Sequence, residues 1–269
     1  MASDNLLLQE RHALILQRLV SDGRVLAPNL AQQLNVSEDT IRRDLRDLAA
    51  AGLCQKVYGG ALRLPSAPDT GTLAQRTTQQ AGDKSRLAQT AATLVEAGNI
   101  LFIDAGSTNL AIAAALPPVP LTVITNAPAI AMALTQRLQI ELIMIGGRID
   151  PHVGATLGGA ALRDIDLIRP DLFFLGACGV DAQAGVSAIH FEEAEFKRRV
   201  AAISKAVAIA ATDDKLGTAA PYLVLPTGQL TYLVIESSAE VAQITPFSAI
   251  GVQVLRAETL QAKNRHAKS

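Results

Sequence analysis

A predicted helix that begins after Ser37 carries side chains suited to binding a nucleic acid. Thr40, Arg42, Arg43 and Arg46 follow this start closely. An arginine guanidinium is a planar fork that matches guanine edges or phosphate oxygens, and a threonine hydroxyl can donate a hydrogen bond to phosphate. We therefore predict a recognition helix that enters the major groove of duplex DNA.

The plain alternative is a solvent-exposed helix without a partner. In that case Arg43 would pair with Asp39 and Asp47, each four residues away along the chain. The neighbouring elements favour the DNA-binding interpretation. An apolar stripe with helical spacing predicts the buried face of the same helix, and consists of Ile41, Leu45 and Leu48. The arginines are thereby left on its sides or far face.

The elements before the recognition helix complete a helix-turn-helix. Apolar spacing predicts a first helix over residues 7–20, which ends near Gly23. A small strand at 24–26 precedes a second helix, whose first turn contains Pro28. Asn35 suits a left-handed turn, and Ser37 is expected to cap the third helix with its hydroxyl.

A short hairpin after the recognition helix is expected to form a wing. Residues 55–58 would make one strand, and Gly59-Gly60 its tight return. Lys56 and Tyr58 would reach phosphate or the minor groove, although ordinary hairpin surface is their alternative role.

Beyond residue 83 the pattern changes to short aliphatic runs that alternate with helical stretches. This alternation predicts an α/β domain with a mostly parallel sheet covered on both faces, a doubly wound arrangement. The expected strands are 100–103, 121–125, 141–145, 171–175, 206–210, 230–235 and 252–255. We expect four parts: a winged helix-turn-helix at 1–62, a linker at 63–78, a sensor domain at 79–257 and a basic tail at 258–269.

Polar residues gather directly after several of these strands, where ligands collect in open parallel sheets. The segment Asp104-Ala105-Gly106-Ser107-Thr108-Asn109 opens a helix, and free N–H groups at a helix start attract an anion. Other strand ends carry Asn126, Gly146, Gly147, Asp213 and Lys215. Each signal alone is commonly turn chemistry, but several together indicate a phosphorylated sugar or polyol. Glu193 and Lys197, at i and i+4, fit a surface pair when taken alone.

Composition excludes several other classes of protein. Nearly half of the residues are hydrophobic, at 49%, so a core can form; aromatics make up only 3%, which argues against a stacking platform for single strands. Two cysteines, Cys54 and Cys178, suggest a reducing compartment. No signal peptide, membrane span or metal-ligand cluster is evident, so we expect a cytoplasmic protein with no metal and no cofactor. The net charge of −1 gives no support for DNA binding, which therefore depends on the local pattern.

The chain resembles a DeoR-family transcriptional regulator over residues 7–257. The motifs that carry this resemblance are VSEDTIRRDLRDL, KVYGGA, FIDAGSTNL, TVITNAPAIAMAL, IELIMIGGRI, DLFFLGACGVDAQAGVS, EEAEFKRR and TDDKLG. The resemblance implies a winged helix-turn-helix joined to a sensor similar to ribose-phosphate isomerase. It also implies repression of a carbohydrate-catabolism operon and release from the operator when a sugar phosphate binds.

The resemblance assigns roles to individual residues as well. Thr40, Arg42 and Arg43 match the recognition helix. The effector pocket is matched by Asp104, Gly106, Ser107, Thr108, Asn126, Gly147, Lys197, Asp213 and Lys215. Asn109 stands where the family usually has threonine.

Two hypotheses follow. In the first, the chain is a non-enzymatic repressor that binds double-stranded operator DNA as a homodimer or homotetramer and is released by a phosphorylated sugar or polyol. In the second, it is a sugar-phosphate isomerase or deaminase with an appended DNA-binding domain, in which Asp104, Glu193 or Asp213 would act as a general base.

Overall fold

The computed structural model describes residues 7–63 and 71–258 of the chain. The predicted basic tail lies outside these residues except for Glu258, as does the 64–70 part of the predicted linker. Among the described residues, no helix combines the length and apolar character needed to cross a bilayer.

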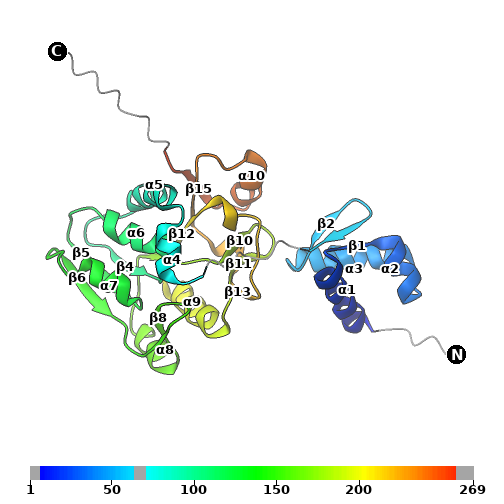
Figure 1. The fold of residues 1–269 in the computed structure, drawn as a ribbon, viewed down its shortest axis with the longest axis horizontal. Coiled ribbons are helices and arrows are strands. Elements are labelled where there is room, and N and C mark those ends of the chain that lie inside the picture. The colour runs from blue at the N-terminus through cyan, green and yellow to red at the C-terminus, as the bar shows by residue number, and fades with distance from the viewer. Residues whose placement is uncertain (1–6, 64–70, 259–269) are drawn as a thin grey trace, which may run out of the picture.

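Residues 7–63 form the predicted winged helix-turn-helix, drawn in blue in Figure 1. Its elements are α1 (Leu8–Asp22), β1 (Arg24–Leu26), α2 (Ala27–Leu34), α3 (Glu38–Ala50), β2 (Gln55–Val57) and β3 (Gly60–Leu62). The three strands form a small antiparallel sheet in the order β1-β3-β2. Asn35 adopts the expected left-handed conformation, with φ 51°, between α2 and α3. A separate core lies beneath these elements and includes Ile15, Leu19, Ile41 and Leu45.

The second part of the chain contains a sheet of seven strands, all paired in parallel. Each of the seven predicted aliphatic runs supplies one strand. They are β4 (Ile100–Ile103), β5 (Leu121–Thr125), β6 (Ile140–Met144), β9 (Leu172–Phe174), β12 (Ala206–Ala211), β14 (Tyr232–Ile235) and β15 (Gln253–Arg256). The inner strands are buried because helices cover the sheet, whereas the edge strands β6 and β15 are largely exposed. In the core the rings of Phe102 and Phe173 meet edge to face at 5.5 Å, and Phe196 packs beside them.

The helices and short strands connect this sheet. The α-helices are α4 (Leu73–Thr78), α5 (Ala81–Ala92), α6 (Ser107–Ala115), α7 (Pro128–Leu134), α8 (Gly159–Ile165), α9 (Phe191–Ile203) and α10 (Val241–Ala249). Two 3₁₀ turns are η1 (Asp213–Lys215) and η2 (Thr227–Gln229). Five short strands outside the main sheet are β7 (Arg148–Asp150), β8 (Ala155–Leu157), β10 (Gly179–Asp181), β11 (Gly185–Ala188) and β13 (Tyr222–Leu225).

In the strand order β15-β14-β12-β9-β4-β5-β6, the side on which the chain adds new strands changes once. From β4 the chain first adds β5 and β6 on one side, and then returns to add β9, β12, β14 and β15 on the other. The loops that follow β4 and β9 therefore leave in opposite directions and open a crevice between them. Such a switch point is where doubly wound sheets bind ligands.

Candidate DNA surface and effector cavity

The recognition helix α3 is fixed at its start and along its inner face. The Ser37 hydroxyl accepts a hydrogen bond from the Thr40 backbone N–H at 3.1 Å, so Ser37 caps the helix as expected. The Thr40 hydroxyl lies 2.8 Å from the Ser37 hydroxyl. Ile41 and Leu45 are fully buried, which turns the opposite face of the helix toward solvent.

That outer face presents the three predicted arginines. Arg42, Arg43 and Arg46 are all exposed. Arg42 binds Glu38 at 2.8 Å, whereas Arg43 and Arg46 form no ion pair with any described residue. The Arg43 pairs expected of an ordinary exposed helix are therefore absent from the described residues. Two guanidinium groups on α3 remain available to a partner.

The hairpin of β2 and β3 projects next to α3 as the predicted wing. Lys56, Tyr58 and Gly59 are exposed, whereas Gly60 is buried against β1. Gly59 has φ +79°, which allows the tight return. Tyr58 is fully exposed at the tip of the hairpin.

In the sensor domain a cavity of about 800 Å³ opens at the switch point of the sheet. Its walls include residues 105–109 after β4, residues 175–178 after β9, and Lys215 after β12. Glu193 and Lys197 of α9 line it as well, and Arg76 of α4 and Leu16 and Val20 of α1 border it. The cavity therefore lies where the sensor domain meets the DNA-binding domain.

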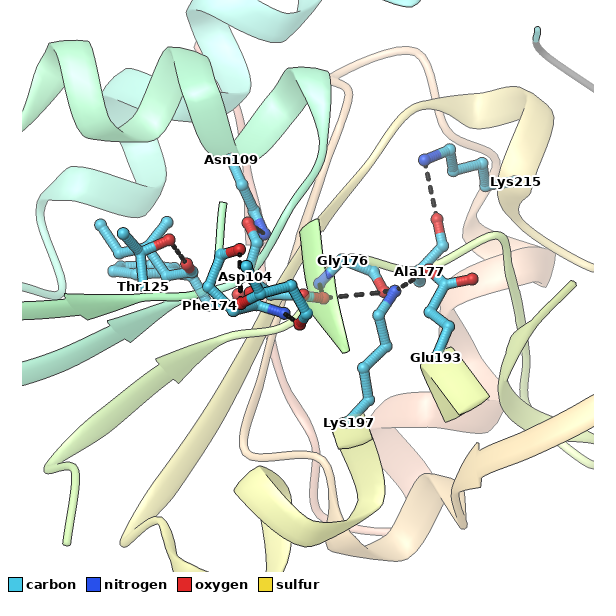
Figure 2. Close-up of polar contacts among 12 residues, drawn as sticks. Asp104, Asn109, Thr125, Phe174, Gly176, Ala177, Glu193, Lys197 and Lys215 are labelled. Carbon is cyan, nitrogen blue, oxygen red and sulfur yellow. Dashed lines mark hydrogen bonds and ion pairs between the residues drawn. The ribbon is translucent and has the colours of Figure 1, made fainter. Parts of the chain in front are cut away.

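Lys197 occupies the floor of this cavity, between two carboxylates. Its Nζ lies 2.5 Å from Glu193 Oε1 and 3.2 Å from Asp104 Oδ2, and it also donates to the Gly176 carbonyl at 2.6 Å. Figure 2 shows Lys197 rising from α9 toward Gly176, while Asn109 reaches toward the sheet from the opposite side. All three charged side chains are buried.

The electrostatics of this cluster follow from its burial. Burial alone would lower the pKa of Lys197, but the attraction of Asp104 and Glu193 outweighs it and raises that pKa. Burial raises the pKa of Asp104, and the charge of Lys197 opposes that shift. Because two carboxylates face one ammonium group, Lys197 has little positive charge to offer a ligand.

The N-terminus of α6 forms the second wall. Gly106 has φ +145°, a conformation that favours glycine, and its carbonyl accepts the first helical hydrogen bond, from Leu110. Ser107 and Thr108 are 9% and 6% exposed and line the cavity, yet their hydroxyls make no hydrogen bond to a described residue. Both side chains line the cavity without an internal partner, so their hydroxyls are free to bind a ligand there.

Asn109 holds this wall in place. Its side-chain nitrogen donates to the carbonyls of Asp104 at 2.9 Å and Phe174 at 3.0 Å. The side-chain amide therefore joins the loop after β4 to the end of β9, and its N–H groups are directed at the backbone.

Lys215 supplies a cation that no carboxylate neutralises within ion-pair distance among the described residues. Its Nζ donates to the Ala177 carbonyl at 2.8 Å, as Figure 2 shows. Burial lowers the pKa of Lys215. An anion in the cavity would therefore stabilise the charged form of Lys215.

Other predicted effector residues lie away from the cavity. Asn126 donates to the Thr156 carbonyl at 3.1 Å and is otherwise buried, while Gly146 and Gly147 follow β6 at the edge of the sheet. Asp213 accepts a hydrogen bond from Ser238 at 2.8 Å, near the end of β14. None of these four residues lines the cavity.

Sequence reasoning did not single out the loop after β9. There the Gly176 N–H donates to Asp104 Oδ2 at 3.0 Å, and a Cβ at Gly176 would lie 2.4 Å from the Ala105 carbonyl oxygen. Cys178 lines the cavity as well. This loop bears no charged or amide side chain, so the available signals were its position after a buried strand and its place within the motif DLFFLGACGVDAQAGVS.

The residues present do not form a metal site, since no group of three His, Cys, Asp or Glu residues suited to a metal occurs within 7–63 and 71–258. The arrangement instead offers N–H groups, hydroxyls and one lysine to an anion.

Comparison with known proteins agrees with both halves of this structure. The model of the DeoR C-terminal sensor domain matches residues 79–237, and that of the DeoR-like helix-turn-helix domain matches residues 11–67. An uncharacterized HTH-type transcriptional regulator FruR of Bacillus subtilis (strain 168) is 32% identical over 79% of this chain and 84% of its own length. The glycerol-3-phosphate regulon repressor of Escherichia coli (strain K12) is 32% identical over 77% of this chain and 82% of its own length.

Among solved structures, ribose 5-phosphate isomerase A from Methanocaldococcus jannaschii covers 51% of this chain and 55% of its own, with 16% identity and a TM-score of 0.38. At that TM-score the likeness carries no functional argument. The two family models and the relatives of similar length carry the assignment: this chain belongs to the DeoR family of transcriptional regulators.

Proposed function

We propose that the chain represses a carbohydrate-catabolism operon and leaves its operator when a phosphorylated sugar or polyol occupies the cavity at the switch point. The observation that supports this proposal is a pair of cavity-lining hydroxyls without a hydrogen bond to a described residue, those of Ser107 and Thr108 at the start of α6. A phosphate group needs hydrogen-bond donors around it, and the free backbone N–H groups at a helix N-terminus supply them.

The remaining groups fit the rest of such a ligand. Lys215 would neutralise part of the phosphate charge. Glu193 binds Lys197 through Oε1, which leaves Oε2 to accept a hydrogen bond from a sugar hydroxyl. The name of the Escherichia coli relative, a glycerol-3-phosphate regulon repressor, also supports a phosphorylated polyol as the class of ligand.

On the DNA side, α3 would enter the major groove, with Arg43 and Arg46 contacting bases or phosphates and Lys56 and Tyr58 on the wing. Contacts from one such module cover only a short half-site, so we propose a homodimer or homotetramer on paired half-sites. Size-exclusion chromatography coupled to light scattering would test this oligomeric state. The molar mass of a monomer at micromolar concentration, both without and with DNA, would contradict the proposal.

We further propose that the sensor domain has no enzymatic activity. Asp104 and Glu193 both pair with Lys197, so neither is a free general base, and Asp213 lies outside the cavity. Incubation of the purified chain with aldose and ketose phosphates and with amino-sugar phosphates is expected to yield no product above background. Turnover that disappears with Glu193→Gln would instead support an isomerase or deaminase.

The regulatory function is tested by the release of DNA. Duplexes that the wild-type chain binds are selected from a random library, and the best is used in a fluorescence anisotropy titration. Each sugar or polyol of a panel is added in its phosphorylated and free form. Release by one phosphorylated form, but not by its free form, is expected for the wild type and for the control Arg163→Met on α8. Lys215→Met is expected to require much more ligand. A panel that releases nothing, and that leaves the melting temperature unchanged, would count against the effector site.

A further inference from the structure

Arg76 lies at the border of the cavity on α4, the first helix after the segment that leaves the DNA-binding domain. Thr72 caps this helix: its hydroxyl accepts from the Gln75 N–H at 3.4 Å, while the Gln75 side chain accepts from the Thr72 N–H at 2.9 Å. This capping box fixes the start of α4. Arg76 therefore moves with the whole helix, and its position depends on how α4 is seated, that is, on how it packs against the sensor domain.

The Nε of the half-buried Arg76 side chain lacks a hydrogen-bond partner. This atom is shielded from solvent, and no carboxylate in the described parts of the chain pairs with the guanidinium. A buried donor without an acceptor costs free energy, since it has given up water without replacement. An acceptor that arrives with the effector would remove this cost.

Positive charge accumulates around Arg76. Burial lowers the pKa of both Lys84 and Lys215, and repulsion from Arg76 lowers each further, against attraction from Asp214. Glu193, which lines the cavity, and Asp104 beside it are already paired with Lys197. Arg76 and Lys215 line the cavity without an ion pair to any described residue, so an anion there would balance their charge.

The backbone of α4 is tied to the sensor domain at its end. Lys84 of α5 is 6% exposed, and its Nζ donates to the carbonyls of Arg76 and Gln79, the latter at 2.7 Å. Helix α4 also packs against α6, whose N-terminus forms the anion-binding wall. Arg76 and the hydroxyls of Ser107 and Thr108 consequently border one cavity from two different helices.

We infer that Arg76 binds the phosphate of the effector and thereby links the occupancy of the cavity to the seating of α4, the helix that leads from the DNA-binding domain. This inference rests on the proposed function and adds the residue through which the ligand acts. A phosphate held between α6 and Arg76 favours the arrangement in which α4 is docked. Since a ligand shifts an equilibrium only by binding its two states differently, this contact supplies the required difference.

A direct test uses inorganic phosphate as the probe, at constant ionic strength set by chloride. Calorimetric titration compares the wild type with Arg76→Met, Arg76→Lys and the exposed control Arg163→Met. Loss of a charged hydrogen-bonding partner is expected to weaken phosphate binding by about tenfold or more in Arg76→Met. Arg76→Lys is expected to lie in between, because an ammonium group keeps the charge but not the two-pronged geometry.

Hydrogen exchange of residues 73–78 reports the seating of α4. Phosphate is expected to slow exchange there in the wild type and in Arg163→Met, but not in Arg76→Met. Without phosphate, Arg76→Met is expected to melt at the same temperature as the wild type or higher, since it removes an unpaired cation.

The possible failures are distinguishable. If the wild type does not bind phosphate, the anion site is wrong, and the proposed function and this inference fall together. If Arg76→Met binds phosphate as the wild type does, the inference is wrong while the proposed function stands. If binding weakens but phosphate never slows exchange in α4, the link between the ligand and α4 is refuted.

Discussion

The guanidinium of Arg11 in α1 grips the carboxylate of Asp44 on the inner side of the recognition helix, with Nε 2.5 Å from Oδ2 and Nη2 3.0 Å from Oδ1. Asp44 is 1% exposed, so this two-pronged pair fixes α3 against α1 from within the core. The Arg11–Asp44 pair therefore also sets the positions of the exposed arginines on the outer side of α3.

Arg11→Met should therefore loosen the DNA-binding domain. It removes the two-pronged partner of a buried carboxylate and leaves only His12, whose Nε2 lies 3.4 Å from Asp44 Oδ1, so we expect a loss of about 3 kcal/mol in the unfolding free energy of this domain. Urea unfolding of the full chain, followed by hydrogen exchange in α3, measures the effect. Arg18→Met removes an exposed pair with Asp22 and is the control, with little expected change. Equal stability of the two variants would show that the Arg11 pair does not support the fold.

Arg43→Ala should weaken operator binding without affecting the fold. Arg43 is exposed and has no ion pair with a described residue, so its contacts are available to DNA. If it reads a base, we expect a loss of about 1–3 kcal/mol in operator binding, measured by anisotropy against the selected duplex. Arg163→Met in the sensor domain is the control. An affinity equal to that of the wild type would exclude Arg43 from the interface.

Lys197→Met should destabilise the sensor domain in a manner that depends on pH. The raised pKa of Lys197 means that its charge stabilises the fold throughout the neutral range. Without that charge, the already raised pKa of Asp104 rises further, and a carboxyl with a raised pKa costs stability as pH increases. We expect a loss of about 3–5 kcal/mol near neutral pH that shrinks as the pH falls and Asp104 becomes protonated.

Chemical unfolding at a series of pH values measures this effect. Lys205→Met is the matched control, since Lys205 pairs with Asp171 at the surface and its side chain is 74% exposed. A loss for Lys197→Met that is constant with pH would contradict the assigned role of Asp104.

Gly176→Ala should destabilise the floor of the cavity. The added methyl would meet the Ala105 carbonyl oxygen at 2.4 Å and Asp104 Oδ2 at 2.9 Å, neither of which can move freely. We expect a loss of about 2 kcal/mol in thermal or urea unfolding. Gly228→Ala is the control, because a Cβ there meets no atom within 4 Å. If both variants unfold alike, the loop after β9 must be able to shift.

Cys178 offers a chemical probe of the cavity. It lines the cavity, whereas Cys54 is fully buried in the DNA-binding domain. Inorganic phosphate or an effector is expected to slow alkylation of Cys178 in the native protein in proportion to occupancy. Mass spectrometry measures the rate, and Cys178→Ser shows which cysteine reacts. Unchanged alkylation at saturating ligand would place the ligand elsewhere.

Much of the fold was accessible from the sequence. The parallel strands were found because strands covered on both faces are continuous aliphatic runs, and Ser37 and Asn35 marked the ends of helices by their local chemistry. The short strands β7, β8, β10, β11 and β13 were missed, since a few residues beside glycines carry no distinct periodicity.

Only part of the candidate site could be predicted from the sequence, because the local spacing of residues does not reveal the order of the strands in the sheet. Ser107 and Thr108 follow a strand at the switch point and line the cavity, whereas Asn126 and Gly147 follow strands on one side of it. Lys197 was expected from resemblance alone, and its neutralisation by Asp104 required the packing of α9 against the sheet. Arg76 escaped notice because a lone arginine in a short helix has no pattern.

The reversal of winding at the switch point between the parallel strands β4 and β9 also bears on how such a regulator can diversify. The residues that would meet the ligand lie at strand ends and on helices around the cavity, while the strands beneath them share a single hydrophobic core. A new metabolite could be accommodated by exchanging the side chains of Ser107, Thr108 and Cys178, provided that Asn109 is retained to hold the wall and Asp104 and Gly176 to seat Lys197. Single substitutions in the cavity could therefore change which ligand the sensor domain binds while the fold stays the same.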